Sequence, residues 1–131
     1  MTVDGKTGAH CYSGYSASRY PAGQSPHGRG GGEMVSAIRQ NGGPVSIKLN
    51  RSGNNSATLG SFSVAIDVVS AVPLRQYDSY FNASPERRIG HELGHAVFGT
   101  DDAGPRKMKN VLENEEPIAM ALCDPNTRTD Y

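Results

Sequence analysis

The chain has 131 residues, which suits one compact domain, and it combines 16 Gly and 8 Pro with an apolar fraction of only 36%. This composition predicts short elements, many turns and a modest core. The 13 basic and 13 acidic residues balance, so neither a nucleic-acid partner nor an anionic membrane surface is expected. No stretch approaches the roughly 20 apolar residues that span a bilayer, so no membrane span is expected.

Residues 1–32 are glycine-rich with scattered tyrosines, which predicts an irregular N-terminal segment ahead of a folded domain over 33–131. The opening residues lack the basic-then-apolar plan of a secretory signal, so export would need a route independent of a signal peptide. The two cysteines, Cys11 and Cys123, are far apart in sequence. They could form a disulfide in an oxidising compartment or remain two buried thiols.

The next segments predict a helix and then strands. Residues 33–40 have helical spacing of apolar residues and end at Asn41-Gly42-Gly43, a natural stop. Residues 45–50 and 62–69 alternate polar and apolar, which favours an antiparallel pair of half-buried strands and leaves room for a third short one. Residues 73–80 are expected to break this pattern. The side chains expected to point inward are Val45, Ile47, Leu49, Phe62, Val64, Ile66 and Val68.

A well-delimited helix is predicted over 85–98. Ser84 suits the N-cap, Pro85 suits the first helical position, and Gly99 provides a stop. A second helix is expected over about 106–122, interrupted at Pro117.

The helix over 85–98 contains the sequence His91-Glu92-Leu93-Gly94-His95. Residues four apart share a helix face, so both imidazoles can reach one zinc ion, while Glu92 can act as general base toward the water on that ion. Gly94 weakens the helix, which a close approach by another element would explain. Asp67, at the end of a strand, is a candidate partner for a zinc-bound imidazole.

The third metal ligand stays open among three acids. Glu115 follows His91 by 24 residues, the spacing of thermolysin-type sites in which a following helix supplies the glutamate. Asp101 follows His91 by ten residues, where metzincins place their last ligand, although Phe98 stands where that pattern needs glycine. Glu116, beside Glu115, is the remaining candidate.

The C-terminal third resembles bacterial effector metallopeptidases, the compact zincin domains at the C-termini of Rhs-type polymorphic toxins and type VI secretion spike proteins. The resemblance covers roughly residues 84–131. It implies that Glu115 binds the metal, although Glu116 stands where the family pattern has asparagine, and it draws attention to Tyr131 as an oxyanion donor. The residues that carry it are His91-Glu-Leu-Gly-His-Ala, Asn110-Val111, Asn114-Glu115-Glu116-Pro117-Ile118 and Arg128-Thr129-Asp130-Tyr131.

Together these features predict an α+β, zincin-like domain, in which a small antiparallel sheet packs on the motif helix and a ligand-bearing helix follows. The expected function is hydrolysis of peptide bonds by a zinc metallopeptidase, with strand 45–50 or 62–69 bordering the substrate cleft. The resemblance implies a secreted effector or toxin that acts in a target cell, in the bacterial periplasm or in a host, and an immunity protein as a partner. The alternatives are a zinc amidase that acts on a cell-wall or other non-peptide amide, a peptidase that cleaves a repressor, and a non-catalytic zinc-binding module.

Overall fold

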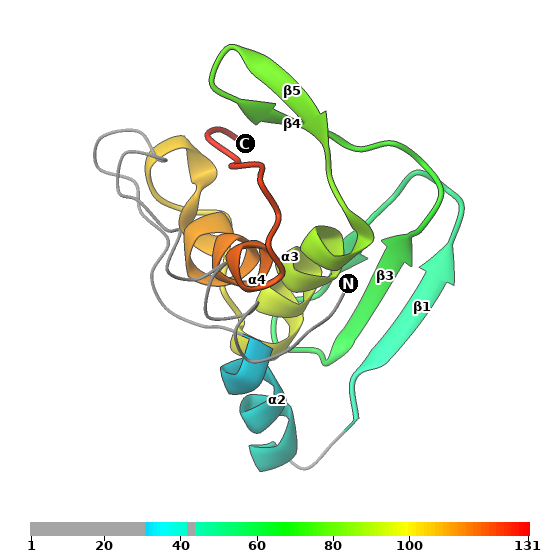
Figure 1. Cartoon of the computed structure of the whole chain (residues 1–131). Coiled ribbons are helices and arrows are strands. Elements are labelled where there is room, and N and C mark those ends of the chain that lie inside the picture. The colour runs from blue at the N-terminus through cyan, green and yellow to red at the C-terminus, as the bar shows by residue number, and fades with distance from the viewer. Residues whose placement is uncertain (1–30, 42–43) are drawn as a thin grey trace.

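The computed structural model describes residues 31–41 and 44–131, and the helix α3 (Pro85–Phe98) lies at its centre. Figure 1 shows α3 between a small sheet and the C-terminal helical segment. Most of the predicted segment 1–32 lies outside the described residues, and its last two residues, Gly31 and Gly32, already belong to the helix α2 (Gly31–Gln40). The mixture of helices and small sheets agrees with the α+β prediction.

The predicted bounds of α3 are confirmed. The Ser84 side chain accepts a hydrogen bond from the backbone N–H of Arg87, and Pro85 occupies the first turn. Gly99 adopts the left-handed conformation with φ 65°, and its N–H closes on the carbonyls of Gly94 and His95. The helix that carries the motif is therefore held at both ends by its own sequence.

The main sheet has three strands in the order β1–β3–β2: β1 (Ser46–Asn50), β3 (Ser63–Asp67) and β2 (Ser56–Ala57). β2 pairs antiparallel with β3, but β1 runs parallel to β3, so the predicted antiparallel pairing of those two strands is wrong. The connecting segment contains β2 and crosses to the other edge of β3, whereas the alternation of side chains carries no information on strand direction.

The predicted inward face of the sheet is correct within β3 and wrong for β1. Val64 and Ile66 are buried and pack with Ala96 of α3. Val68, just beyond β3, is 43% exposed where an inward position was expected. Ile47 and Leu49, on the edge strand β1, are 45% and 63% exposed. The difference arises because α3 packs on β2 and β3, so the alternating pattern of β1 marks a strand but not a buried face.

Residues expected to break the sheet instead form a second, two-stranded one. β4 (Pro73–Gln76) and β5 (Ser79–Asn82) pair antiparallel as a hairpin. The turn passes through Tyr77 at φ 50°, a conformation for which the sequence has neither glycine nor asparagine. The usual hairpin signal is therefore missing.

The C-terminal helical segment is continuous over residues 109–121, where an interruption at Pro117 was predicted. A π-helical turn, η3 (Val111–Glu115), precedes α4 (Glu116–Ala121), and the N–H of Glu116 reaches the carbonyl of Val111. This wider turn is how the helix accommodates a proline that lacks an N–H. Cys123, just beyond, is disulfide-bonded, and Cys11 lies outside the described residues. No helix in the described ranges has both the length and the apolar character to cross a membrane.

Candidate metal centre

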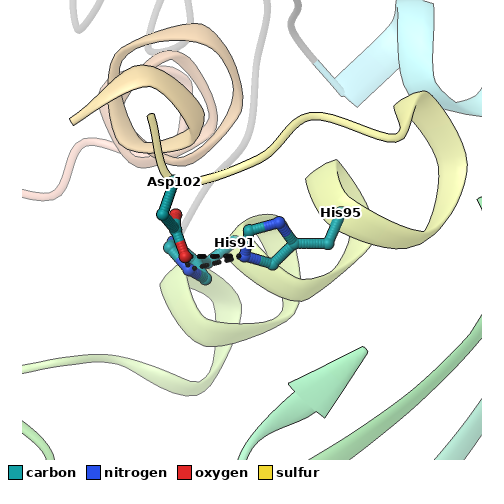
Figure 2. Close-up of side chains that lie close together, drawn as sticks. All are labelled: His91, His95 and Asp102. Carbon is teal, nitrogen blue, oxygen red and sulfur yellow. Dashed lines mark hydrogen bonds and ion pairs between the residues drawn. The ribbon is translucent and has the colours of Figure 1, made fainter. Parts of the chain in front are cut away.

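The two motif histidines face each other on the buried side of α3, as Figure 2 shows. The Nε2 atoms of His91 and His95 lie 3.2 Å apart, and the rings meet nearly at right angles, with an interplanar angle of 84°. The helical spacing alone explains this pairing, because residues four apart occupy the same face. The prediction that both imidazoles converge on one point is therefore confirmed.

The hydrogen bonds at the far nitrogens determine which atoms carry protons. His91 Nδ1 lies 2.8 Å from Oε2 of Glu115, and His95 Nδ1 lies 2.5 Å from the carbonyl of Thr100. Both partners are acceptors, so each Nδ1 donates, and in the neutral rings both Nε2 atoms present lone pairs toward each other. Two facing lone pairs repel unless a proton or a cation lies between them.

The carboxylate of Asp102 brings a third potential metal ligand to the same point. Its Oδ2 is 3.3 Å from Nε2 of His95 and its Oδ1 is 3.7 Å from Nε2 of His91. Oδ1 is also a buried atom with no hydrogen-bond partner in the described part of the chain. In a tetrahedral zinc site with bonds near 2.05 Å, neighbouring ligand atoms lie about 3.3 Å apart. The three side chains therefore fit a divalent ion of this kind.

Protons can stabilise the same cluster when no cation is bound. The hydrogen bond that His95 donates to the Asp102 carboxylate raises the pKa of His95 above its ordinary value, against the opposing effect of burial. Burial would raise the pKa of Asp102, but hydrogen bonds from His95 and Tyr131 lower it overall. Both shifts favour a charged His95–Asp102 pair when no metal is bound, and a metal would displace the proton of that pair.

The structure places Asp102 where the sequence analysis considered Asp101, Glu115 or Glu116. Asp101 points away and pairs with Lys109 at 3.5 Å, while Glu116 is buried against Arg87. The left-handed turn at Gly99 ends α3 and changes the direction of the chain, so the second acid of the Asp101-Asp102 doublet reaches the histidines. The Asp101-Asp102 doublet was the available signal in the sequence. The metzincin spacing pointed only to its first member, Asp101, as a candidate ligand.

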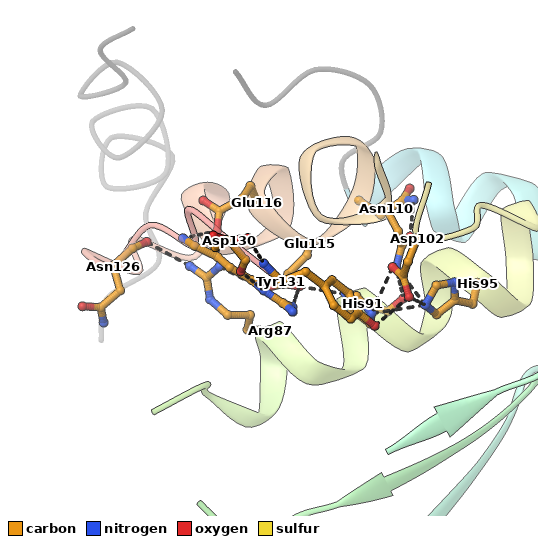
Figure 3. Close-up of polar contacts among 12 residues, drawn as sticks. Arg87, His91, His95, Asp102, Asn110, Glu115, Glu116, Asn126, Asp130 and Tyr131 are labelled. Atoms are coloured by element: carbon orange, nitrogen blue, oxygen red, sulfur yellow. Dashed lines mark hydrogen bonds and ion pairs between the residues drawn. The ribbon is translucent and has the colours of Figure 1, made fainter. Parts of the chain in front are cut away.

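Glu115 lies behind His91, on the opposite ring nitrogen from Asp102 (Figure 3). Its carboxylate also accepts hydrogen bonds from Arg128 Nη1 at 2.9 Å and from Arg87 Nη1 at 3.1 Å. Burial alone would raise the pKa of Glu115, but the bond from His91 and the two guanidinium charges lower it to about 2. Glu115 is consequently an ionised carboxylate that holds the His91 ring in one orientation and tautomer.

Arg87 anchors a buried ionic cluster beneath this pair. It contacts Glu116, pairs with Asp124 at 3.1 Å and donates to the Asn126 carbonyl at 2.9 Å. Its pKa is raised because the charges of Glu116 and Glu115 outweigh burial. Glu115, the last residue of η3, and Glu116, the first residue of α4, both contact Nη1 of Arg87.

Glu92 lies beside the histidines at the wall of a pocket of about 150 Å³. Burial raises its pKa above the ordinary value, although the charges of His91 and His95 oppose this effect. A raised pKa favours proton uptake by a carboxylate near neutral pH. The pocket is lined by Asn55, Val72, Leu74, Ala83, Arg87, Arg88, His91, Glu92, Glu115, Arg128 and Tyr131.

The C-terminal segment folds back over the centre. Thr129 donates its N–H to the carbonyl of Arg75 in β4 at 2.9 Å, and the Tyr131 hydroxyl donates to Oδ2 of Asp102 at 2.7 Å. Arg128 stacks on the Tyr131 ring, 4.6 Å from its centroid. Burial and the bond to Asp102 raise the pKa of Tyr131 to about 12, so its hydroxyl keeps its proton at neutral pH.

Two other sequence expectations have definite outcomes. Asp67 does not contact an imidazole: its carboxylate accepts the backbone N–H groups of Val69 and Ser70 at 2.7 and 2.8 Å. Gly94 meets the close approach that was predicted, because a Cβ there would lie 2.2 Å from the side-chain oxygen of Asn110. Asn110 in turn donates to the carbonyl of His91 at 2.9 Å.

Arg87 and Thr100, which stabilise the site from outside, were missed by the sequence analysis because no motif marks a residue whose only role is to contact a ligand-bearing side chain.

Comparisons with protein-family models, with curated proteins and with solved structures found no match to this chain.

Proposed function

We propose that this domain is a zinc-dependent peptidase whose metal is held by His91, His95 and Asp102. The observation that carries the proposal is the convergence of three lone-pair-bearing atoms within 4.8 Å of one another, with Glu92 at the adjoining pocket. The Tyr131 hydroxyl lies 2.7 Å from Oδ2 of Asp102 and Asn110 Nδ2 lies 3.3 Å from Nε2 of His95, but Oδ1 of Asp102 is a buried acceptor without a partner in the described residues.

When bound, zinc would supply a Lewis acid for the scissile carbonyl and would make water a nucleophile at neutral pH. Glu92 would accept the proton from that water and pass it to the leaving amine, which its raised pKa favours. Tyr131 would release Asp102 and donate its hydroxyl to the oxyanion, a role that requires a protonated phenol. Glu115 would keep His91 Nδ1 protonated throughout.

The same geometry favours a catalytic over a structural site. A structural zinc is closed by four protein ligands, whereas the cluster found in the described residues contains three. The adjoining pocket gives a substrate access to the remaining position. Hydrolysis of a non-peptide amide would use the same groups. Cleavage assays with a peptide and with a cell-wall fragment distinguish the two substrates.

An extended substrate would pair with the edge of β2. The centre of β3 is flanked by β1 and β2, so it offers no free edge there. β2 is the edge strand that packs on α3, and Asn55, just before β2, lines the pocket. β1 is the other edge strand, but α3 packs on β2 and β3, so we propose β2 rather than strand 45–50 or 62–69 as the border of the cleft.

The biological setting is proposed from the sequence resemblance. The domain would be a secreted effector or toxin that is delivered to a target cell, with an immunity protein that protects the producer. The proposal for the reaction does not depend on this setting.

The test is peptide cleavage followed by mass spectrometry, with a cell-wall fragment as the alternative substrate. The wild-type protein should cleave peptides with zinc, lose activity with a chelator and regain it when zinc is restored. Glu92→Gln should keep zinc and lose activity by about 100-fold or more, whereas the control Glu86→Gln, in the exposed first turn of α3, should not. Equal cleavage by Glu92→Gln and wild type would refute the proposal.

A further inference from the structure

We infer that the pocket beside the metal centre is a subsite for a carboxylate of the substrate, which Arg88 and Arg128 recognise. This inference deepens the proposed function and rests on it for the identity of the ligand as a substrate. The two sources of such a carboxylate are the side chain of Asp or Glu and the free C-terminus of a peptide.

Arg88 is a buried cation without an acidic partner among residues 31–41 and 44–131. Its guanidinium is bound there by backbone carbonyls: Ala83 accepts from Nε and Nη2 at 3.2 and 2.9 Å, and Asp67 accepts from Nη1 at 2.6 Å. No ion pair within the described ranges includes Arg88, although it is only 9% exposed. Buried charges are normally paired, so the charge of Arg88 would be stabilised by an anionic ligand.

The carbonyl bonds also leave Arg88 with donors to spare. A guanidinium has five N–H groups, and three hydrogen bonds leave two. The three bonds hold the group in one place against β3 and the segment before α3, so its orientation is set before any ligand arrives. A fixed guanidinium matches the planar geometry of a carboxylate better than a mobile lysine would.

Arg128 supplies a second cation at the same pocket. Its Nη1 pairs with Glu115 at 2.9 Å and its Nε donates to the carbonyl of Asp130 at 3.2 Å, and no hydrogen bond from its Nη2 occurs within the described part of the chain. Arg87, the third arginine of the lining, is already engaged by Glu116 and Asp124. Within the described residues Arg87 makes four hydrogen bonds and has one N–H left, whereas Arg88 has two left and Arg128 has three, so Arg88 and Arg128 have the most donors for a ligand.

The acids of the lining do not pair with Arg88. Arg87 is already paired with Glu116 and Asp124, and neither lining glutamate forms an ion pair with Arg88 within the described residues. Glu115 uses both oxygens, with Arg87 on one and with His91 and Arg128 on the other. The anion that satisfies Arg88 must therefore come from outside these residues.

The remaining walls suit the stem of an acidic residue. Val72, Leu74 and Ala83 are apolar and lie in or beside β4 and the segment that leads into α3. An aliphatic wall beside two guanidinium groups would bind the methylenes of a glutamate and its carboxylate together. Because His91 and Glu92 line the same pocket, the carboxylate would lie close to the scissile bond.

The test compares blocked peptides of one sequence that carry Glu or Gln, together with neutral peptides that end in a free carboxylate or an amide. Binding is measured by fluorescence anisotropy and cleavage by mass spectrometry, with zinc present. The wild-type protein should prefer the carboxylate member of one pair by about ten- to a hundred-fold. Arg88→Gln should bring that ratio close to one, and Arg88→Lys should retain part of it. The control Arg39→Gln, exposed on α2, should leave the ratio unchanged.

The outcomes separate this inference from the proposed function. Zinc-dependent cleavage without any preference would overturn the carboxylate subsite and leave the peptidase proposal standing. Preferential binding that is lost in Arg88→Gln, with no cleavage of any peptide, would support the subsite and overturn the peptidase proposal. If Arg88→Gln does not fold, the wild-type preference and the Arg88→Lys ratio decide. A preference confined to the free C-terminus would assign the carboxylate to a chain end.

Discussion

The Nδ1 atom of His91 donates to Oε2 of Glu115 across 2.8 Å, while Asp102 lies at Nε2 of the same ring. The His91 imidazole therefore lies between Asp102 and Glu115, and a sequence motif alone does not tell which of the two acids is at which ring nitrogen. The acid at Nδ1 orients the ring, and in the proposed site the acid at Nε2 would share its metal. The following predictions test this division.

Removing the acid at Nε2 should weaken metal binding strongly. Asp102→Asn replaces a charged ligand with a weak neutral one, so zinc affinity should fall by more than about 100-fold, beyond the cost of losing an outer partner. Asp101→Asn is the matched control, because Asp101 is exposed and contacts Lys109. The measurement is competition with a zinc indicator. Equal losses in the two variants would contradict the assignment.

Removing the charge at Nδ1 should have a smaller effect on zinc. Glu115→Gln keeps an oxygen for His91 but loses the charge shared with Arg87 and Arg128, so zinc affinity should fall by about 10- to 100-fold. The free energy of unfolding should fall by about 1.5–3 kcal/mol, the value of a hydrogen bond to a charged group. Urea unfolding of the variant and of Glu86→Gln measures this change. A complete loss of zinc, larger than that in Asp102→Asn, would instead identify Glu115 as the ligand.

Removing the Tyr131 hydroxyl should affect turnover rather than zinc binding. Tyr131→Phe should lower kcat by about 10²- to 10³-fold, the usual cost of one oxyanion donor, while zinc content and KM change little. Tyr80→Phe, on a 65% exposed side chain of β5, is the control. An unchanged kcat would show that the hydroxyl serves Asp102 alone.

Stability should depend on pH through Asp67, far from the motif. The N–H groups of Ser70 and Val69 lower the pKa of Asp67 below its ordinary value of 3.8. The folded protein therefore binds this proton more weakly than the unfolded chain does, so the stabilisation is present above pH 3.8 and is lost as the pH falls below it. Asp67→Asn should flatten the decline in the urea midpoint between pH 4 and pH 2, and Asp78→Asn, exposed in the hairpin turn, should not. Identical pH profiles for Asp67→Asn and wild type would exclude this role.

Local signals predicted the motif helix well because its determinants lie within a few residues. Ser84, Pro85 and Gly99 fix its ends, and the spacing of His91 and His95 fixes their common face. The glycine at position 94 also predicted a close neighbour, and the structure shows that this neighbour is Asn110.

Features that depend on tertiary context were predicted less well. The direction of β1 depends on a crossover, and its exposed face depends on where α3 packs, neither of which side-chain alternation encodes. The hairpin β4–β5 turns at Tyr77 without a glycine. The choice of Asp102 over Asp101 depends on the path of the chain after Gly99, and the position of Glu115 depends on a π-helical turn before Pro117.

The most direct test of the metal centre is a crystal structure of the zinc-loaded protein with anomalous data at the zinc edge. The anomalous peak should lie about 2.0–2.2 Å from His91 Nε2, His95 Nε2 and a carboxylate oxygen of Asp102, with Glu115 still at His91 Nδ1. A peak bonded to Glu115, or none near the two histidines, would contradict the account.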